Sequence, residues 1–366
     1  MRRLAAVFAC LGLALAGLAA GAHTARAAEA TAAAAPARDD ADCGPIAPEP
    51  ALLVTARAEP GVLPSQPGPA SGPGAIVPLP PAPAEALADA APGEALLALP
   101  KGPDGTVPTD FELAQGASVA SSFFSPVLCA TVVRVVGPPG LDPGALVTQA
   151  PESAVTVPNH LYVGAQTDVR PFDPATGGDP YRPLQWGLER AGAARAWSVT
   201  DGRGARVALL DSPPEAAHPD LAGVRVVSLP GASTAEPAVH GSLMAGVARA
   251  VAGNDFGIAG LAPGAELLAI PVCRPAVAGG GDECPLFDLL RGVDVAWEHS
   301  AQVLNLALVG PPNALLRRAM DRMDELGIVL VAAVGNEGVA EPRYPAAYPS
   351  VIGVGASDRA GGAYAR

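Results

Sequence analysis

Continuous apolar runs of five to eight residues recur through the second half of the chain, separated by stretches with helical spacing. They lie at 206–210, 266–273, 303–308, 328–334 and 351–356. Continuous apolar strands that alternate with helices are typical of a parallel sheet covered on both faces. We therefore predict an α/β domain over residues 179–366, with these five runs as its strands.

Three of the intervening stretches are predicted helices, at 240–252, 285–300 and 315–326. The third carries apolar side chains at helical spacing: Leu315, Leu316, Ala319, Met320, Met323 and Leu326. It ends at Gly327, a common residue just past a helix terminus. In sheets of this class, sites form at the carboxyl ends of the strands. That rule points to Asp211, after the first strand, and to Asn336, after the run that ends at Val334.

Upstream of this domain the pattern weakens. Ala, Pro and Gly dominate residues 28–108, and proline cannot join strand ladders or helix interiors, so we predict a disordered or extended segment. Residues 109–165 contain a β-like run at 128–136 and two shorter candidates at 154–157 and 161–163. They hold too little apolar surface to fold alone, so we predict a small module docked on the larger domain. Residues 166–178 would link the two.

The first 27 residues have the pattern of a secretory signal peptide. Arg2 and Arg3 precede an apolar run to about Ala22, and Ala25 and Ala27 offer small side chains for cleavage. We expect the cleaved protein to be secreted or periplasmic, with no membrane contact after signal cleavage. An uncleaved membrane anchor is the alternative, because the apolar run is long.

Charge and cysteine content refine this picture. The 366 residues carry a net charge of −13, which argues against a nucleic-acid partner, since such a protein shows a basic face. Apart from Cys10 there are four cysteines, and an even number in an oxidising compartment suggests disulfides. We expect Cys273 to pair with Cys284 across a short loop, which leaves Cys43 for Cys129. Four unpaired thiols are the alternative; no histidine lies at zinc-ligand spacing.

Three motifs carry residues of catalytic type. The segment 207–212, which contains Asp211, and the following His218-Pro-Asp-Leu resemble the aspartate motif of subtilisin-like serine peptidases (subtilases, peptidase family S8). His240-Gly-Ser-Leu-Met-Ala-Gly resembles their histidine motif, and the segment 332–336 resembles the one that supplies an oxyanion asparagine, here Asn336. Further matches occur at 185–188, 196–197, 260–263 and 344–346. Their common order over about 180 residues makes the resemblance specific, although each motif alone also fits a turn or a buried histidine.

The resemblance implies a three-layer subtilisin-like domain with a central parallel sheet, and peptide-bond hydrolysis on a polypeptide substrate. It assigns Asp211 as the acid that orients the histidine, His240 as the general base and Asn336 as the oxyanion donor. The chemistry requires no cofactor. Many relatives bind structural calcium, but no carboxylate cluster in this sequence calls for it. Residues 109–165 resemble a proregion, which implies that the chain carries its own intramolecular inhibitor.

The family's nucleophile lies in a Gly-Thr-Ser-x-Ala-x-Pro motif well beyond the turn at 344–346, and no such motif occurs before Arg366. Ser118, Ser242 and Ser357 are poor substitutes by position and context. We therefore expect a serine endopeptidase domain that is C-terminally incomplete, lacks the serine-bearing segment and is inactive alone. Alternatives are an inactive relative with a binding or chaperone-like role, or completion by a separate chain. A dinucleotide site does not fit, because the glycines at 202 and 204 precede the first strand.

Two departures from the family pattern bear on the site. After Asp211 the family usually continues with Thr-Gly or Ser-Gly, whereas here Ser212 is followed by Pro213 and Pro214, which stiffen the turn. Ala307 and Val309 stand in the strand that pairs with substrate, where the family has a serine and a glycine. Substrate binding by backbone pairing is therefore less firmly predicted than the fold.

Overall fold

The computed structural model describes residues 76–78, 90–102, 105–138, 140–164, 178–230, 236–276, 281–336 and 343–363. The expected signal peptide and Cys43 lie outside these ranges, so export and the second disulfide stay predictions. Cys273 and Cys284 form the expected disulfide. Within the described ranges, no helix has the length and apolar character needed to cross a membrane.

A six-stranded parallel sheet forms the centre of the larger domain, in the order β16-β15-β13-β8-β10-β9. Its strands are β8 (Arg206–Asp211), β9 (Arg225–Val226), β10 (Glu266–Pro271), β13 (Val303–Leu306), β15 (Val329–Ala333) and β16 (Ile352–Val354). Each of the five predicted apolar runs contributes a strand, and β9 adds a short edge. The α/β prediction is confirmed.

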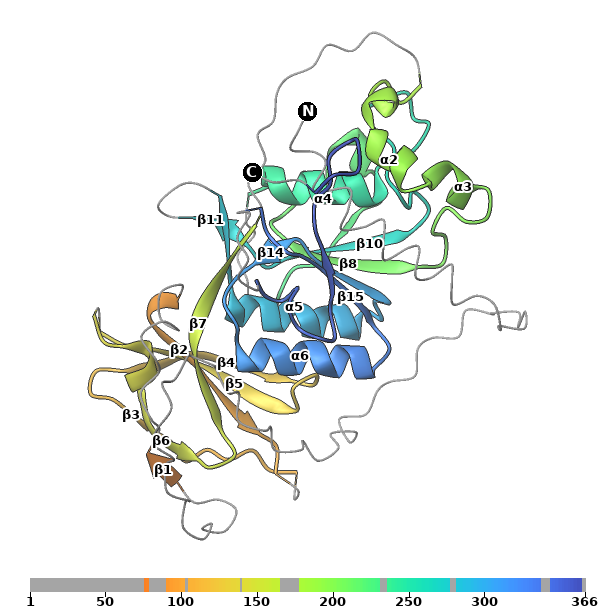
Figure 1. The fold of residues 1–366 in the computed structure, drawn as a ribbon. Coiled ribbons are helices and arrows are strands. Elements are labelled where there is room, and N and C mark those ends of the chain that lie inside the picture. Colours follow the sequence, from red (N-terminus) through yellow and green to blue (C-terminus); the bar gives the residue numbers. More distant parts are fainter. Residues whose placement is uncertain are drawn as a thin grey trace, which may run out of the picture.

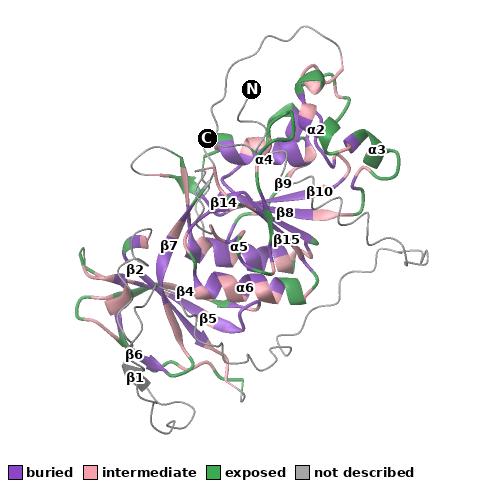
Figure 2. Ribbon diagram, viewed as in Figure 1, coloured by how far each residue is buried: buried purple, intermediate pink, exposed green. Residues whose placement is uncertain are grey.

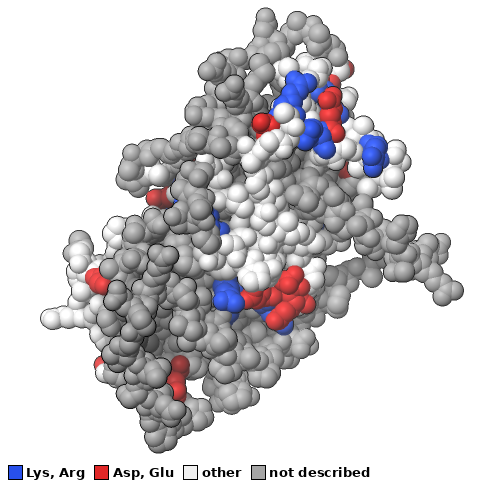
Figure 3. Space-filling view, viewed as in Figure 1, with Lys and Arg blue, Asp and Glu red and all other residues white. Residues whose placement is uncertain are grey.

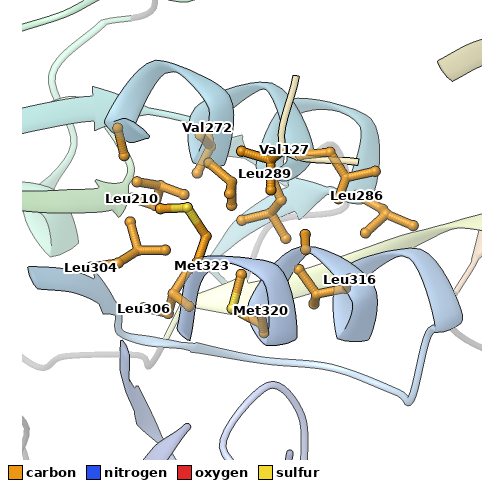
Figure 4. Packing of buried hydrophobic residues seen from close by; sticks show 14 of the residues in the cluster. Val127, Leu210, Val272, Leu286, Leu289, Leu304, Leu306, Leu316, Met320 and Met323 are labelled. Carbon is orange, nitrogen blue, oxygen red and sulfur yellow. The ribbon is translucent and has the colours of Figure 1, made fainter. Parts of the chain in front are cut away.

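Helices cover both faces of this sheet (Figure 1). One face packs against α4 (Val239–Arg249), and the other against α5 (Leu286–Glu298) and α6 (Ala314–Glu325). Alternation along β8 explains the two cores, since Leu209 packs with Met244 of α4 while Leu210 packs with Met320 of α6. Figure 4 shows Leu210, Leu304 and Met323 converging in the second core. Two short helices, α2 (Trp186–Arg190) and α3 (Ala193–Trp197), precede the sheet.

Antiparallel strands dominate the preceding part of the chain, residues 90–164, which we call the N-terminal module. Its strands β2 (Ala90–Pro100), β4 (Ser118–Ser125), β5 (Ala130–Val136) and β7 (Val155–Gly164) pair in the order β7-β2-β5-β4. A smaller sheet joins β1 (Ile76–Pro78), β6 (Val147–Pro151) and β3 (Glu112–Leu113).

The prediction that residues 28–108 form a disordered or extended tether is wrong for 90–100, which form β2, an inner strand of the module's sheet. Leu96, Leu97 and Leu99 are buried there, so the segment joins a core that its Ala- and Pro-rich surroundings conceal. The ladder shifts register between Ala90 and Ala95, and Gly93 takes a φ of 67° within that irregularity. The two candidate strands at 154–157 and 161–163 are one strand, β7.

Strand β7 belongs to both halves of the molecule. Its first part pairs with β2, and its second part lies between two segments of the larger domain, β12 (Asp282–Pro285) and β14 (Leu308–Val309). A further strand, β11 (Arg274–Pro275), continues the ladder beyond β12. One buried cluster contains residues of both parts, such as Leu96 of the module and Leu289 of α5, and Figure 2 shows buried residues in both. Around α2 and α3, basic and acidic side chains lie next to one another (Figure 3).

Candidate active site

Asp211 and His240, 29 positions apart in the sequence, meet at one edge of the parallel sheet. Asp211 is the last residue of β8, and His240 is the second residue of α4. Their side chains are joined by a 2.7 Å contact between His240 Nδ1 and Asp211 Oδ1. Both residues are buried, with exposed fractions of 6% and 3%, so water does not screen the contact.

Ser212 and Gly241 fix how closely the helix approaches the strand. The Ser212 amide and hydroxyl both donate to Asp211 Oδ1, at 2.7 and 3.2 Å, and the same hydroxyl accepts from the Gly241 amide at 3.0 Å. The hydroxyl thus caps the first turn of α4, whose own N-cap residue, Ala238, has no capping side chain. A Cβ atom at Gly241 would lie 1.9 Å from the Ser212 carbonyl oxygen, so only glycine fits.

The loop after β8 holds the start of α4 through its backbone. The Pro213 carbonyl accepts from the Ala238 amide at 2.8 Å, so the proline pair in this loop leaves a usable acceptor. The Asp211 carbonyl accepts from the Val272 and Cys273 amides at 2.9 and 3.2 Å. Cys273 is covalently joined to Cys284 of β12, so the disulfide connects the Asp211 strand end to the strand beside β7.

Electrostatics prepare His240 to take up a proton. Burial of the ring acts to lower its pKa, but the charge of Asp211 and the hydrogen bond to it, helped by Asp282, raise the pKa above its usual value. The other ring nitrogen, Nε2, is buried and has no hydrogen-bond partner in the described part of the chain. With Nδ1–H donating to Asp211, Nε2 is free to accept a proton from an incoming group.

Asn336 lies just beyond β15, at the carboxyl end of that strand. Strands β8, β13 and β15 are parallel neighbours, so Asn336 and Asp211 lie at the same edge of the sheet, where the carboxyl ends of the strands meet. Two strand spacings separate β8 from β15, about 10 Å. Asn336 is half-buried, and its backbone follows Gly335, which takes a φ of 97°.

The end of β7 lies between β12 and β14 and pairs with both strands. Tyr162 pairs with Cys284, while Val163 pairs with Glu283 on one side and Val309 on the other. Tyr162 is completely buried, and its hydroxyl donates to the Pro311 carbonyl at 3.1 Å.

Several residues that matter here were not singled out by the sequence. His160 of β7 accepts at Nδ1 from the Asn313 side chain at 2.9 Å, although the sequence offers no partner pattern for it. Asp282 acts on His240 through space, and Asp294 lies buried in α5. These roles depend on contacts between distant segments. Ser212 could have been found, because it adjoins Asp211.

The remaining polar residues of the aspartate motif have local structural contacts. His218 accepts at Nδ1 from the Asp220 amide at 3.3 Å, and its ring packs edge-on against Phe256. The Asp220 carboxylate accepts from the Asn254 side chain and the Ile258 amide. Within the described ranges, no group of three or more His, Cys, Asp or Glu side chains is arranged to hold a metal ion.

Comparison with known proteins shows which family the domain that carries Asp211 and His240 resembles. Residues 202–365 match the subtilase family. Thermitase of Thermoactinomyces vulgaris is 36% identical over 191 residues, which cover 50% of this chain and 66% of thermitase. Subtilisin Savinase of Lederbergia lenta is 36% identical over 183 residues, covering 48% of this chain and 64% of that protein. The chain thus spans just under two thirds of the length of these relatives.

A solved structure extends the comparison to the fold. Fervidolysin from Fervidobacterium pennivorans, described as a keratinolytic enzyme related to subtilisin, superposes with a TM-score of 0.51 at 22% identity. The superposition covers 73% of this chain and 43% of that one, so it reaches beyond residues 202–365. The superposition supports the fold, and the family match together with the 36% identity to thermitase assigns residues 202–365 to the subtilase family.

Proposed function

We propose that this chain is part of an exported serine endopeptidase of the subtilisin type. One observation carries the proposal: His240 contacts Asp211 at 2.7 Å through Nδ1, while its Nε2 is buried and unpaired in the described part of the chain. Asp211 orients the ring, His240 acts as general base and Asn336 donates to the oxyanion. The family match at 202–365 supports these roles.

The geometry suits acyl transfer. A serine hydroxyl would give its proton to His240 Nε2 as its oxygen attacks the substrate carbonyl, and the imidazolium would return that proton to the leaving amine. The Asp211 carboxylate stabilises the imidazolium in between. In a subtilisin, loss of a single oxyanion donor lowers the rate by about 10²–10³. Asn336 is the proposed donor in this chain. Nothing in this sequence of steps requires a cofactor.

We propose that the nucleophilic serine lies in a segment outside these 366 residues. The environments of the three candidates in the chain support this. Ser118 belongs to β4 of the N-terminal module, and Ser357 forms an isolated bridge with Ala363. The Ser242 hydroxyl donates to the Ala238 carbonyl and accepts from the Glu215 amide.

The substrate is proposed to be a polypeptide that pairs with β12 and β14, and the N-terminal module to be a proregion that occupies this place. The pairing of Val163 with Glu283 and Val309 supports both ideas, because an extended peptide added between two strands gains backbone hydrogen bonds. Val309 takes part in this pairing although the family has glycine there.

Export is proposed from the signal-like residues 1–27. The disulfide between Cys273 and Cys284 agrees with a secreted or periplasmic location, since disulfides persist in oxidising compartments.

The test starts from the genomic DNA beyond codon 366 and the protein which that gene encodes. We expect a Gly-Thr-Ser-x-Ala motif there, labelling of its serine by a fluorophosphonate, and hydrolysis of unfolded polypeptides. His240→Ala should lower kcat by about six orders of magnitude. His299→Ala, at the end of α5, is the control and should retain activity. Activity should rise with pH through the His240 pKa, which lies above 6.5, because the base must be neutral.

The 366-residue chain alone should not be labelled. Labelling that His240→Ala abolishes would show that the nucleophile is within the chain. A full-length product with neither labelling nor hydrolysis would contradict the proposed function.

A further inference from the structure

A buried carboxyl group joins the N-terminal module to the subtilase domain. Asp294 lies in α5 and is only 5% exposed. Its Oδ1 accepts from the Ser125 hydroxyl at 2.9 Å and from the Val127 amide at 3.3 Å. Ser125 is the last residue of β4, and Val127 lies in the turn between β4 and β5 of the module. Asp294 therefore bonds across the junction between the two halves of the molecule.

The surroundings of this carboxyl are apolar. Val127 packs in the same core as Leu289 and Leu290, and Figure 4 shows Val127 beside Leu289 of α5. The second oxygen, Oδ2, is buried without a hydrogen-bond partner among the described residues. An ionised carboxylate with one oxygen in such surroundings is costly, whereas a protonated carboxyl still offers Oδ1 as an acceptor.

We propose that Asp294 is a proton-dependent latch: its protonated form holds the N-terminal module against α5, and its ionisation weakens that attachment. Because the end of β7 is part of the module, weakening would free the strand position between β12 and β14. This regulatory role rests on the proposed function, in which a substrate takes that position.

The pKa of Asp294 agrees with this geometry. Burial raises the pKa from 3.8 to about 8, the hydrogen bonds from Ser125 and Val127 oppose the rise, and the charge of Glu298 adds to it. Glu298 is on α5 itself, and the two donors from the module, the Ser125 hydroxyl and the Val127 amide, are uncharged.

Two further titratable groups face the junction. Asp288 of α5 has a raised pKa, because burial outweighs the nearby Arg291, Arg274 and Arg134, and Glu94 of the module adds to the rise. His160 of β7 contacts Asn313. Removing Asp294 therefore removes one part of the pH dependence and leaves the part that belongs to Asp288.

The sign of the effect follows from proton linkage. Docking raises the Asp294 pKa, so docking takes up a proton between the ordinary carboxyl pKa of about 4 and the docked value of about 8. Attachment should weaken by up to about tenfold per pH unit across that interval and become constant above it. The module is therefore held most firmly in acid and least firmly at mildly alkaline pH.

Amide hydrogen exchange of the whole chain tests the latch without requiring catalysis. The readout is the protection factor of residues 161–163, which corrects for the intrinsic effect of pH on exchange. Pairs within the module, such as Leu97 with Val133, serve as an internal reference. We expect protection at 161–163 to fall from about pH 5 to about pH 8 and then level off.

Asp294→Asn keeps the acceptor oxygen but has no proton to lose. The change of protection with pH should therefore lose the contribution of Asp294, which is at most about tenfold per pH unit. Asp324→Asn removes an exposed carboxylate from α6 and should leave the slope unchanged. Ser125→Ala should lower protection at every pH. A wild-type slope retained in Asp294→Asn, or no slope in the wild type, would overturn the proposal.

A ¹³C NMR titration of the Asp294 carboxyl in the wild-type chain covers the case in which the variant does not fold. A midpoint near 8 supports the latch, and a midpoint below about 5 overturns it. A full-length product without peptidase activity would refute the proposed function and leave both measurements valid.

Discussion

The two sheets of this molecule use their strands differently. The parallel sheet brings residues together at strand ends: Asp211 closes β8, and Asn336 follows β15. In the antiparallel sheet, one long strand, β7, connects the two parts of the molecule, because its backbone pairs with β12 and β14 of the larger domain. Side-chain chemistry in the first case can be recognised from short motifs. Register in the second case cannot, because it arises from pairs more than 100 positions apart.

The antiparallel half can be challenged at Tyr162. Tyr162→Ala should lower the free energy of unfolding by about 3–5 kcal/mol, because it empties a fully buried aromatic site. Tyr162→Phe loses only the hydroxyl contact to Pro311 and should cost about 1 kcal/mol. Urea unfolding of both variants measures this. Equal losses would mean that the ring contributes little to attachment.

The parallel half can be challenged at Gly241. Gly241→Ala places a methyl group against the Ser212 carbonyl and should destabilise the domain by about 1–3 kcal/mol while separating His240 from Asp211. Gly246→Ala, in the same helix, adds a methyl at an ordinary 3.6 Å from Ile258 and should be neutral or slightly stabilising. Thermal unfolding compares the two. Similar stabilities would contradict the close approach of α4 to β8.

The smallest expected effect concerns the pKa of His240 at the edge of the parallel sheet. Asp211→Asn should lower the pKa of His240, because it removes the charge that holds the proton. Asp282→Asn should lower it less, since Asp282 acts only through space. Proton NMR titration of the His240 ring gives both values. A larger fall in Asp282→Asn would show that the Asp211 contact is not the main support of the imidazolium.

Much of the parallel half could be predicted from sequence. All five apolar runs became strands, and the motif order brought Asp211 and His240 into one site. The positions of helices α4 to α6 also agreed with the predicted ranges. These successes share one cause, which is that each signal is contained in a few consecutive residues.

The antiparallel half was predicted less well, for physical reasons. Strand β2 carries Pro92 and Gly93, which read as breakers until the irregular register between Ala90 and Ala95 accommodates them. Strand β7 continues through Pro158, which pairs with Ala95. Asp294 occupies a helix position that looks ordinary until Ser125 is placed against it. Each case depends on a partner from a distant segment.

Because β7 is tethered to the domain it pairs with, its pairing with β12 and β14 does not depend on the protein concentration. A strand covalently joined to the domain it pairs with competes with any free peptide at a local concentration in the millimolar range for short tethers. Dilution of the protein does not change that competition. A single break in the backbone between Gly164 and Asp179 would turn the same strand into an ordinary ligand, which is lost on dilution.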